Sequence, residues 1–197
     1  MATNTPSVLI VEDEPDLATL YATWLEDTYD VETAYDGEEA LEAIDETVDV
    51  VLLDRRMPVL SGDEILSTIR EDGLECRIAM VTAVEPDFDI IELGFDDYLV
   101  KPVSKAELLQ IVDQLLLRSS YDEQLQRFFA LSSKNALLKA EKSDAELRSS
   151  EEYAQLQDQL AVLRVQVNET MEELLERDGY RRLCQDISRG SVRQDSG

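Results

Sequence analysis

The sequence of 197 residues contains no histidine and only two cysteines. Without histidine the chain cannot build a Ser-His-Asp triad, use imidazole as a general base or bind zinc through imidazole. Cys76 and Cys184 form no CxxC motif and provide no disulfide framework, so both are expected to be free thiols in a reducing compartment. These absences exclude histidine-dependent catalysis and argue against a secreted, disulfide-rich domain.

Long hydrophobic runs and basic leaders are also missing. No run approaches the roughly 18 apolar residues of a membrane-spanning helix, and residues 1–7 contain neither a basic segment nor a long apolar stretch. The chain lacks a Walker A or GxGxxG loop, so nucleotide binding is not expected. We therefore expect a cytoplasmic protein without a membrane partner.

Positive charge is scarce, because 18 Lys and Arg face 44 Asp and Glu, giving a net charge of −26. Residues 1–118 contribute −22 of this and residues 119–197 only −4. A chain this acidic repels a phosphate backbone unless a basic patch intervenes. DNA is thus a candidate partner that the charge does not support. The excess of carboxylates has two interpretations, a halophilic adaptation to high salt or an ordinary acidic protein.

The first 118 residues alternate between short apolar runs and segments of helical period. Residues 8–11 form an apolar run, typical of a strand buried on both faces, and further strands are predicted at 31–35, 48–53, 77–81 and 97–100. Pro15 suits the first turn of a helix, and Ser61 with Glu64 has capping-box spacing. A shorter helix is predicted over 86–93. Strands separated by helices predict an α/β fold, a doubly wound, five-stranded parallel sheet.

The remaining residues predict helices alone. Residues 121–177 contain no proline and no glycine. One helix is predicted around 125–138, and Ser143 with Glu146 offers a capping box for a second. The second helix carries a heptad stripe, which consists of Tyr153, Leu156, Leu160, Leu163, Val167, Thr170 and Leu174. This stripe fits either an αα-hairpin or an intermolecular coiled coil. Asp178 and Gly179 are expected to end the helix.

Polar residues end four of the five predicted strands. Glu12 and Asp13 follow the first strand, Asp54 the third, Thr82 the fourth and Lys101 the fifth. The carboxyl ends of parallel strands meet at one edge of such a sheet, so three carboxylates are expected to converge there. Crowded carboxylates repel one another unless a cation lies between them, and oxygen ligands suit Mg²⁺. Together with the Thr82 hydroxyl and the Lys101 ammonium group, the pattern indicates a site for phosphoryl transfer.

These residues stand in motifs that resemble the receiver domain of two-component response regulators, which has a flavodoxin-like fold. The motifs are Val-Glu-Asp-Glu-Pro at 11–15, Asp-Arg-Arg-Met-Pro at 54–58, Ser-Gly at 61–62, Val-Thr-Ala at 81–83 and Asp-Asp-Tyr-Leu-Val-Lys-Pro at 96–102. The resemblance covers residues 7–118. An Mg²⁺-dependent phosphatase with an Asp nucleophile is disfavoured, because such enzymes usually carry a second Asp at the position of Arg56.

The resemblance implies a role for each site residue. Asp54 is the expected phosphoacceptor. The expected Mg²⁺ ligands are Asp54, Asp13 directly, Glu12 through water, and the backbone carbonyl of Arg56. Lys101 and Thr82 are expected to contact phosphoryl oxygens.

Two further residues and the phosphodonor follow from the same resemblance. Tyr98 matches the aromatic switch residue of the family, which turns inward as Thr82 moves toward the phosphoryl group. The Arg56 side chain is expected to border the cleft and to influence how long the phosphoryl group survives. The donor is expected to be a sensor histidine kinase or a phosphotransfer protein, since this chain has no histidine. The chain is then no enzyme beyond its own phosphorylation and dephosphorylation.

Residues 121–175, with Leu-Gln-Arg-Phe-Phe-Ala-Leu at 125–131, resemble the HalX-type output domain found after receivers in halophilic archaea. That resemblance implies transcriptional regulation. The alternative is a phosphorylation-controlled interaction or dimerisation module that forms a homodimer without binding DNA. The expected domains are a flexible N-terminus (1–6), a receiver (7–118), a helical output domain (119–178) and a disordered tail (179–197).

Overall fold

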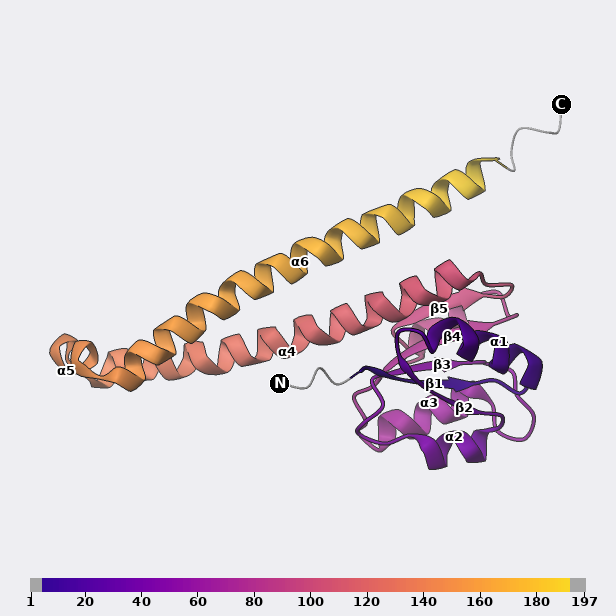
Figure 1. Cartoon of the computed structure of the whole chain (residues 1–197), viewed down its shortest axis with the longest axis horizontal. Coiled ribbons are helices and arrows are strands. Elements are labelled where there is room, and N and C mark those ends of the chain that lie inside the picture. The colour runs from indigo at the N-terminus through magenta and orange to yellow at the C-terminus, as the bar shows by residue number, and fades with distance from the viewer. Residues whose placement is uncertain (1–4, 192–197) are drawn as a thin grey trace. The chain divides into compact units, whose positions relative to one another are not determined.

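Five short strands form a parallel sheet at the centre of the N-terminal part of the chain (Figure 1). The strand order is β2-β1-β3-β4-β5 and all neighbouring strands are parallel. Every connection is therefore a crossover, and the chain reverses its direction across the sheet between β2 and β3, as in a doubly wound fold. This confirms the predicted fold class. The strands are β1 (Ser7–Val11), β2 (Asp30–Ala34), β3 (Val50–Leu53), β4 (Arg77–Thr82) and β5 (Asp97–Val100).

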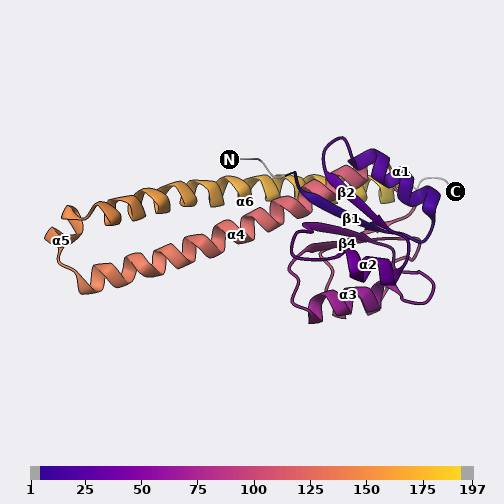
Figure 2. The same ribbon diagram turned by 60° about the horizontal axis from the view of Figure 1, so that its bottom comes forward.

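Helices cover both faces of the sheet (Figure 2). Side chains of α1 (Pro15–Leu25) and of the first turns of α4 (Lys105–Glu141) pack with Val8 and Ile10 of β1 on one face. Side chains of α2 (Gly37–Ala43) and α3 (Gly62–Glu71) pack with Leu9 and Val11 on the other. Alternate residues of β1 therefore enter different cores, which is why the strand is apolar throughout.

The computed structural model describes the backbone of residues 5–191 and the side chains of residues 5–177. It divides into two compact units after Leu116. Two predictions fall partly outside the described residues. These are the flexible N-terminus, of which residues 1–4 are not described, and the disordered tail, of which residues 192–197 are not described. Within the described part, no helix is both long and apolar enough to cross a membrane.

The helix predicted over 86–93 is shorter than expected. The structure has a 3-10 helix, η1 (Phe88–Glu92), in which no residue is buried. Most helical stability in proteins comes from packing of an apolar face. Because η1 packs no such face, its backbone is not stabilised as a full α-helix.

No helix ends at the domain boundary that was predicted near residue 118. α4 is one helix of 37 residues that begins at Lys105, so the helix predicted around 125–138 is only its second half. The physical reason is the absence of proline and glycine between Val103 and Asp178, since these are the residues that most readily end or kink a helix.

The C-terminal unit contains the rest of α4, the short α5 (Asp144–Ser149) and the long α6 (Glu151–Ser191). The capping box at Ser143 and Glu146 is present, but it begins α5 rather than the long helix. The Ser150 hydroxyl then accepts a hydrogen bond from the Tyr153 N–H at 3.1 Å, at the start of α6. The predicted end at Asp178 and Gly179 is wrong, because α6 continues to Ser191. A single glycine disfavours a helix by only about 1 kcal/mol.

The predicted heptad stripe faces α4, so the chain forms an αα-hairpin by itself. Every stripe residue is buried or half-buried. Asn135 of α4 accepts hydrogen bonds from Tyr153 Oη at 3.0 Å and Gln157 Nε2 at 2.7 Å. The Thr170 hydroxyl donates to Gln124 Oε1 at 3.1 Å. These bonds fix the two helices in an antiparallel register.

Candidate functional site

Three carboxylates meet where β1 and β3 end. Glu12, Asp13 and Asp54 each place an oxygen within 4.8 Å of the others. Backbone bonds hold them there, because the Glu12 N–H donates to Ala34 O at 3.0 Å and the Asp54 N–H to Val11 O at 2.9 Å. Glu12 and Asp54 are buried, with exposed fractions of 2% and 7%. The structure thus brings together the acidic residues that the sequence singled out.

Lys101 lies between two of these carboxylates. Its Nζ is 2.6 Å from Glu12 Oε2 and 2.5 Å from Asp54 Oδ2. Burial alone would lower the pKa of Lys101, but the hydrogen bonds to Asp54 and Glu12 outweigh it and raise the pKa above its ordinary value. Burial raises the pKa of Glu12. One ammonium group faces three carboxyl groups, so the site retains negative charge.

One carboxylate oxygen of Glu12 accepts no hydrogen bond. Its Oε1 is buried and has no hydrogen-bond partner. A buried carboxylate oxygen in this state is costly unless a cation or a donor reaches it. The donor set consists of three carboxylates, which are the ligands of hard divalent cations such as Mg²⁺. The residues present therefore fit a magnesium ion.

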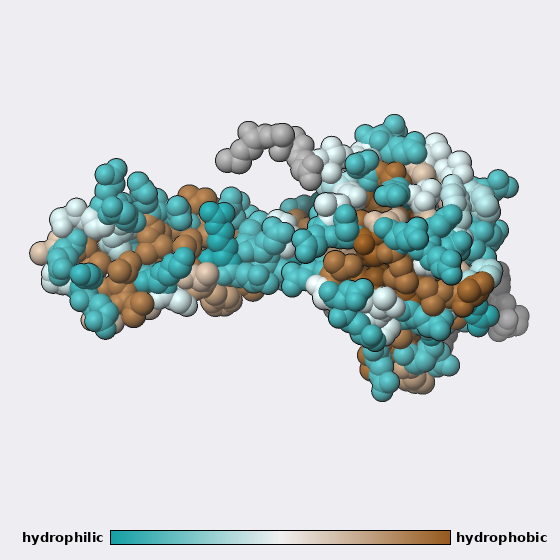
Figure 3. Space-filling model, turned by 90° about the horizontal axis from the view of Figure 1, so that it is seen from below, coloured by the Kyte–Doolittle hydropathy of each residue, from teal (hydrophilic) through white to brown (hydrophobic). Residues whose placement is uncertain are grey.

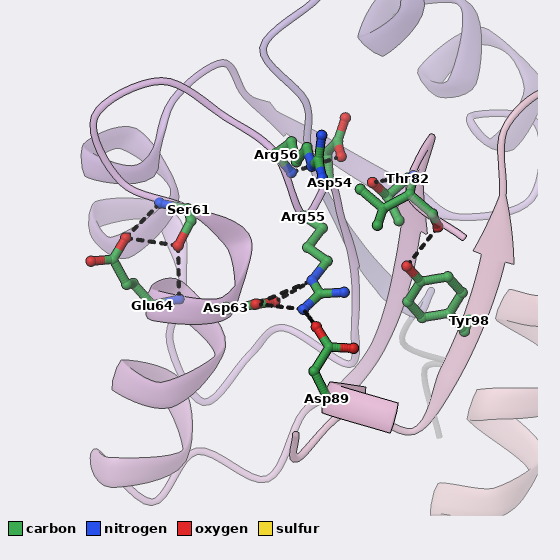
Figure 4. A network of polar contacts seen from close by, with 10 residues as sticks. Asp54, Arg55, Arg56, Ser61, Asp63, Glu64, Thr82, Asp89 and Tyr98 are labelled. Carbon is green, nitrogen blue, oxygen red and sulfur yellow. Dashed lines mark hydrogen bonds and ion pairs between the residues drawn. The ribbon is translucent and has the colours of Figure 1, made fainter. Parts of the chain in front are cut away.

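Thr82 and Tyr98 are joined through one residue. Thr82 is fully buried at the end of β4, and its hydroxyl accepts a hydrogen bond from the Val84 N–H at 3.4 Å. The Tyr98 hydroxyl donates to the Val84 carbonyl at 2.8 Å, and burial raises its pKa. Figure 4 shows Tyr98 beside the loop that follows Thr82. The two side chains are therefore linked through the backbone of Val84.

The loop after Asp54 is tightly packed. The Arg56 N–H donates to Asp54 Oδ1 at 3.1 Å, while the Arg56 side chain is exposed. A Cβ on Gly62 would lie 2.2 Å from the Asp54 carbonyl oxygen, a backbone atom that cannot move aside freely. Only glycine allows this close approach. Gly62 also bonds through its N–H to Arg55 O at 3.0 Å, which fixes the loop that carries the acceptor.

Arg55 belongs to a network that the sequence did not reveal. Its guanidinium binds both carboxylate oxygens of Asp63 at 3.0 and 3.1 Å and also contacts Asp89 of η1. Its side chain points away from Asp54 toward these two partners (Figure 4). No spacing rule links residue 55 to residue 89, so this pairing had no signal in the sequence.

Family models match two parts of the chain. The response regulator receiver domain matches residues 8–113, and the HalX domain matches residues 117–184. A Haloferax volcanii protein described as "Putative transcriptional regulator" is 51% identical over 160 residues, which cover 81% of this chain and 27% of that protein. PhoP, the alkaline phosphatase synthesis transcriptional regulatory protein of Bacillus subtilis, is 42% identical over 57% of this chain and 49% of its own length.

Solved structures agree with the family models. The Thermotoga maritima response regulator TrrA, crystallised in complex with Mg²⁺-BeF, matches with a TM-score of 0.50 and 34% identity, over 56% of this chain and 99% of that chain. The chain spans about a quarter of the length of the Haloferax relative and about half of PhoP. The chain belongs to the response regulator receiver family, and its receiver domain is followed by a HalX domain.

Proposed function

We propose that this chain accepts a phosphoryl group on Asp54 from a sensor histidine kinase or a phosphotransfer protein. An Asp54 carboxylate oxygen attacks phosphorus, the bond from phosphorus to the donor atom breaks, and an acyl phosphate forms. The donor leaves with the bonding electron pair. The observation that carries this proposal is a buried acceptor carboxylate that contacts an ammonium group and lies beside a buried carboxylate oxygen with no partner.

The surrounding residues supply positioning and charge. Lys101 Nζ, now 2.5 Å from Asp54, is placed to bind a phosphoryl oxygen once Asp54 is esterified. The Thr82 hydroxyl would donate to another phosphoryl oxygen. Phosphoryl transfer depends mainly on such positioning and on neutralisation of the developing charge.

Glu12, Asp13, Asp54 and the Arg56 carbonyl would hold Mg²⁺. When bound, the ion neutralises the carboxylates and withdraws charge from the phosphoryl oxygens. The similar TrrA protein carries Mg²⁺-BeF, which supports a magnesium role here. Since Glu12 is buried and Asp13 half-buried, Asp13 is the more accessible direct ligand.

Incubation with acetyl phosphate tests the magnesium requirement. The full chain is expected to gain one phosphoryl group with Mg²⁺ and none after chelation with EDTA, because the uncompensated carboxylates repel the anionic donor. Intact mass spectrometry measures the gain. Adding excess Mg²⁺ to the chelated sample should restore incorporation of the phosphoryl group. Equal incorporation with and without the metal would contradict the proposed site.

We further propose that phosphorylation is relayed through Thr82 and Tyr98 to the helical HalX domain, with transcriptional regulation as the output. The Val84 residue that bonds to both side chains supports the first step. The relative described as "Putative transcriptional regulator" supports the output. A second candidate output is a protein-interaction module, which the near-neutral charge of residues 119–197 and the absence of a basic helix favour.

Retention on DNA separates the two outputs. If the interaction module is correct, the phosphorylated chain should elute from immobilised double-stranded DNA with a non-interacting control protein at every salt concentration. DNA binding would instead give retention that falls steeply as salt rises, since each phosphate contact releases counterions. The comparison uses the full chain, with and without acetyl phosphate.

A further inference from the structure

The second half of α4 carries a face that nothing in the described chain covers. We call it the outer α4 face. All of its side chains are exposed, and none is charged. It consists of Gln126, Phe129, Ala130, Ser133, Ala136, Leu137 and Ala140. These positions repeat every seven residues, so they lie on one side of the helix. Phe129 and Leu137 are 60% and 65% exposed.

The neighbouring part of α6 is apolar at the same level. The hydrogen bonds from Thr170 to Gln124 and from Tyr153 to Asn135 set the register, which places Phe129 level with Val162 and Val165. These valines are 57% and 55% exposed. Figure 3 shows hydrophobic residues gathered on the surface of the helical hairpin. Helical spacing puts these valines on the side of α6 away from the stripe that faces α4, whereas Phe129 and Leu137 lie on the outer side of α4. The two sets therefore form separate exposed apolar surfaces, each of the kind that marks interaction sites.

The hairpin leaves its own core incomplete. In residues 117–177, whose side chains are described, the hydrophobic residues that are buried are Leu147 and Leu163. The other apolar residues of the heptad stripe are only half-buried. Two helices alone cannot enclose an apolar core, whereas four can. The helical unit on its own therefore leaves apolar surface in contact with water, and the outer α4 face is part of that surface.

Charge favours a second copy of this chain as the occupant. Residues 117–141 of α4 carry a net charge of +1, while residues 151–177 of α6 carry −5. Two copies that meet through α6 would repel each other, but two that meet through α4 would not. The outer α4 face adds no charge of its own. An α4-centred dimer therefore brings the least acidic surface of the unit together.

We propose that the outer α4 face is the interface of a homodimer in which two α4 helices pack antiparallel across a two-fold axis at Ser133. This rests on the proposed role of the output unit as an interaction module. Phe129 and Leu137 lie four residues on either side of Ser133, so Phe129 of one copy packs against Leu137 of the other. In an isologous interface the residue on the axis meets itself. The small side chains at 130, 133, 136 and 140 let the helices approach closely.

Cysteine crosslinking tests the axis directly. Ser133→Cys in a Cys76→Ala, Cys184→Ser background should form a covalent dimer under mild oxidation, because the two thiols face each other. Ser149→Cys, which is also exposed but lies on α5, is the matched control and should stay monomeric. Crosslinking of both variants to the same extent would indicate random collision and overturn the proposal, as would no crosslinking at Ser133→Cys.

Sedimentation measures the same interface without a crosslink. The full chain should sediment as a dimer at micromolar concentration, and Leu137→Glu should weaken dimerisation at least tenfold. The control Gln159→Glu, Gln166→Glu adds charge on α6 outside the outer α4 face and should leave the dimer intact. A wild type that remains monomeric would overturn the interface. Leu137→Glu should still accept a phosphoryl group on Asp54, so failure of the interface is distinguishable from failure of the phosphoacceptor proposal.

Discussion

Asp54→Asn is expected to abolish incorporation of the phosphoryl group from acetyl phosphate. An amide is no nucleophile toward phosphorus under these conditions, so the loss should be complete rather than partial. The side chain is isosteric, and its single carbonyl oxygen can keep one of the two contacts that Asp54 makes, with Lys101 Nζ or with the Arg56 N–H. The fold should therefore survive, and intact mass spectrometry should show the unmodified chain.

Asp49→Asn provides the matched control for that experiment. Asp49 directly precedes β3, at the end of the strand away from Asp54, and it is exposed. The same chemical change there should leave incorporation at the wild-type level. A phosphoryl group on the Asp54→Asn chain would place the acceptor on another residue and contradict the proposed function.

Lys101→Met is expected to destabilise the magnesium-free chain by about 3 to 5 kcal/mol. The side chains of Lys101, Glu12 and Asp54 are only 12%, 2% and 8% exposed, and removing one partner leaves buried carboxylates without compensation. Urea denaturation in EDTA measures the free energy of unfolding. The loss should shrink when Mg²⁺ is added, because the cation replaces the missing positive charge.

A second substitution identifies the cause of that loss. Lys101→Met, Asp54→Asn removes one of the carboxylates that Lys101 neutralises and should recover part of the stability. The double-mutant cycle then gives the coupling between the two residues. Additive effects of the two changes, with no response to Mg²⁺, would show that the ammonium group is not needed to hold the carboxylates together.

Most of the fold followed from sequence periodicity and from strand ends. Short strand-like segments between helical ones predicted the five strands. The polar residues immediately after the strands predicted that Glu12, Asp13 and Asp54 are neighbours. The rule that parallel strands end at one edge of the sheet was enough for this result. The heptad stripe likewise predicted the face of α6 that packs in the hairpin.

What the sequence did not reveal depends on tertiary contacts and on weak local preferences. Arg55 binds Asp63 and Asp89, which lie 8 and 34 residues away, and no local pattern predicts such pairings. Gly179 carried a helix-end signal that α6 overrides. The 3-10 form of η1 follows from missing burial, which a hydrophobic pattern around Ile90 and Ile91 cannot disclose.

The unbroken α4 helix decides how the chain can be cut into parts. The receiver match ends at residue 113, yet Leu115 is fully buried in the core of the receiver unit. A fragment that stops at residue 113 would lack this side chain and would end in frayed helical turns. Its measured stability would then reflect the truncation and not the intact receiver domain. The two domains share a backbone element, and any dissection has to choose which of them keeps it.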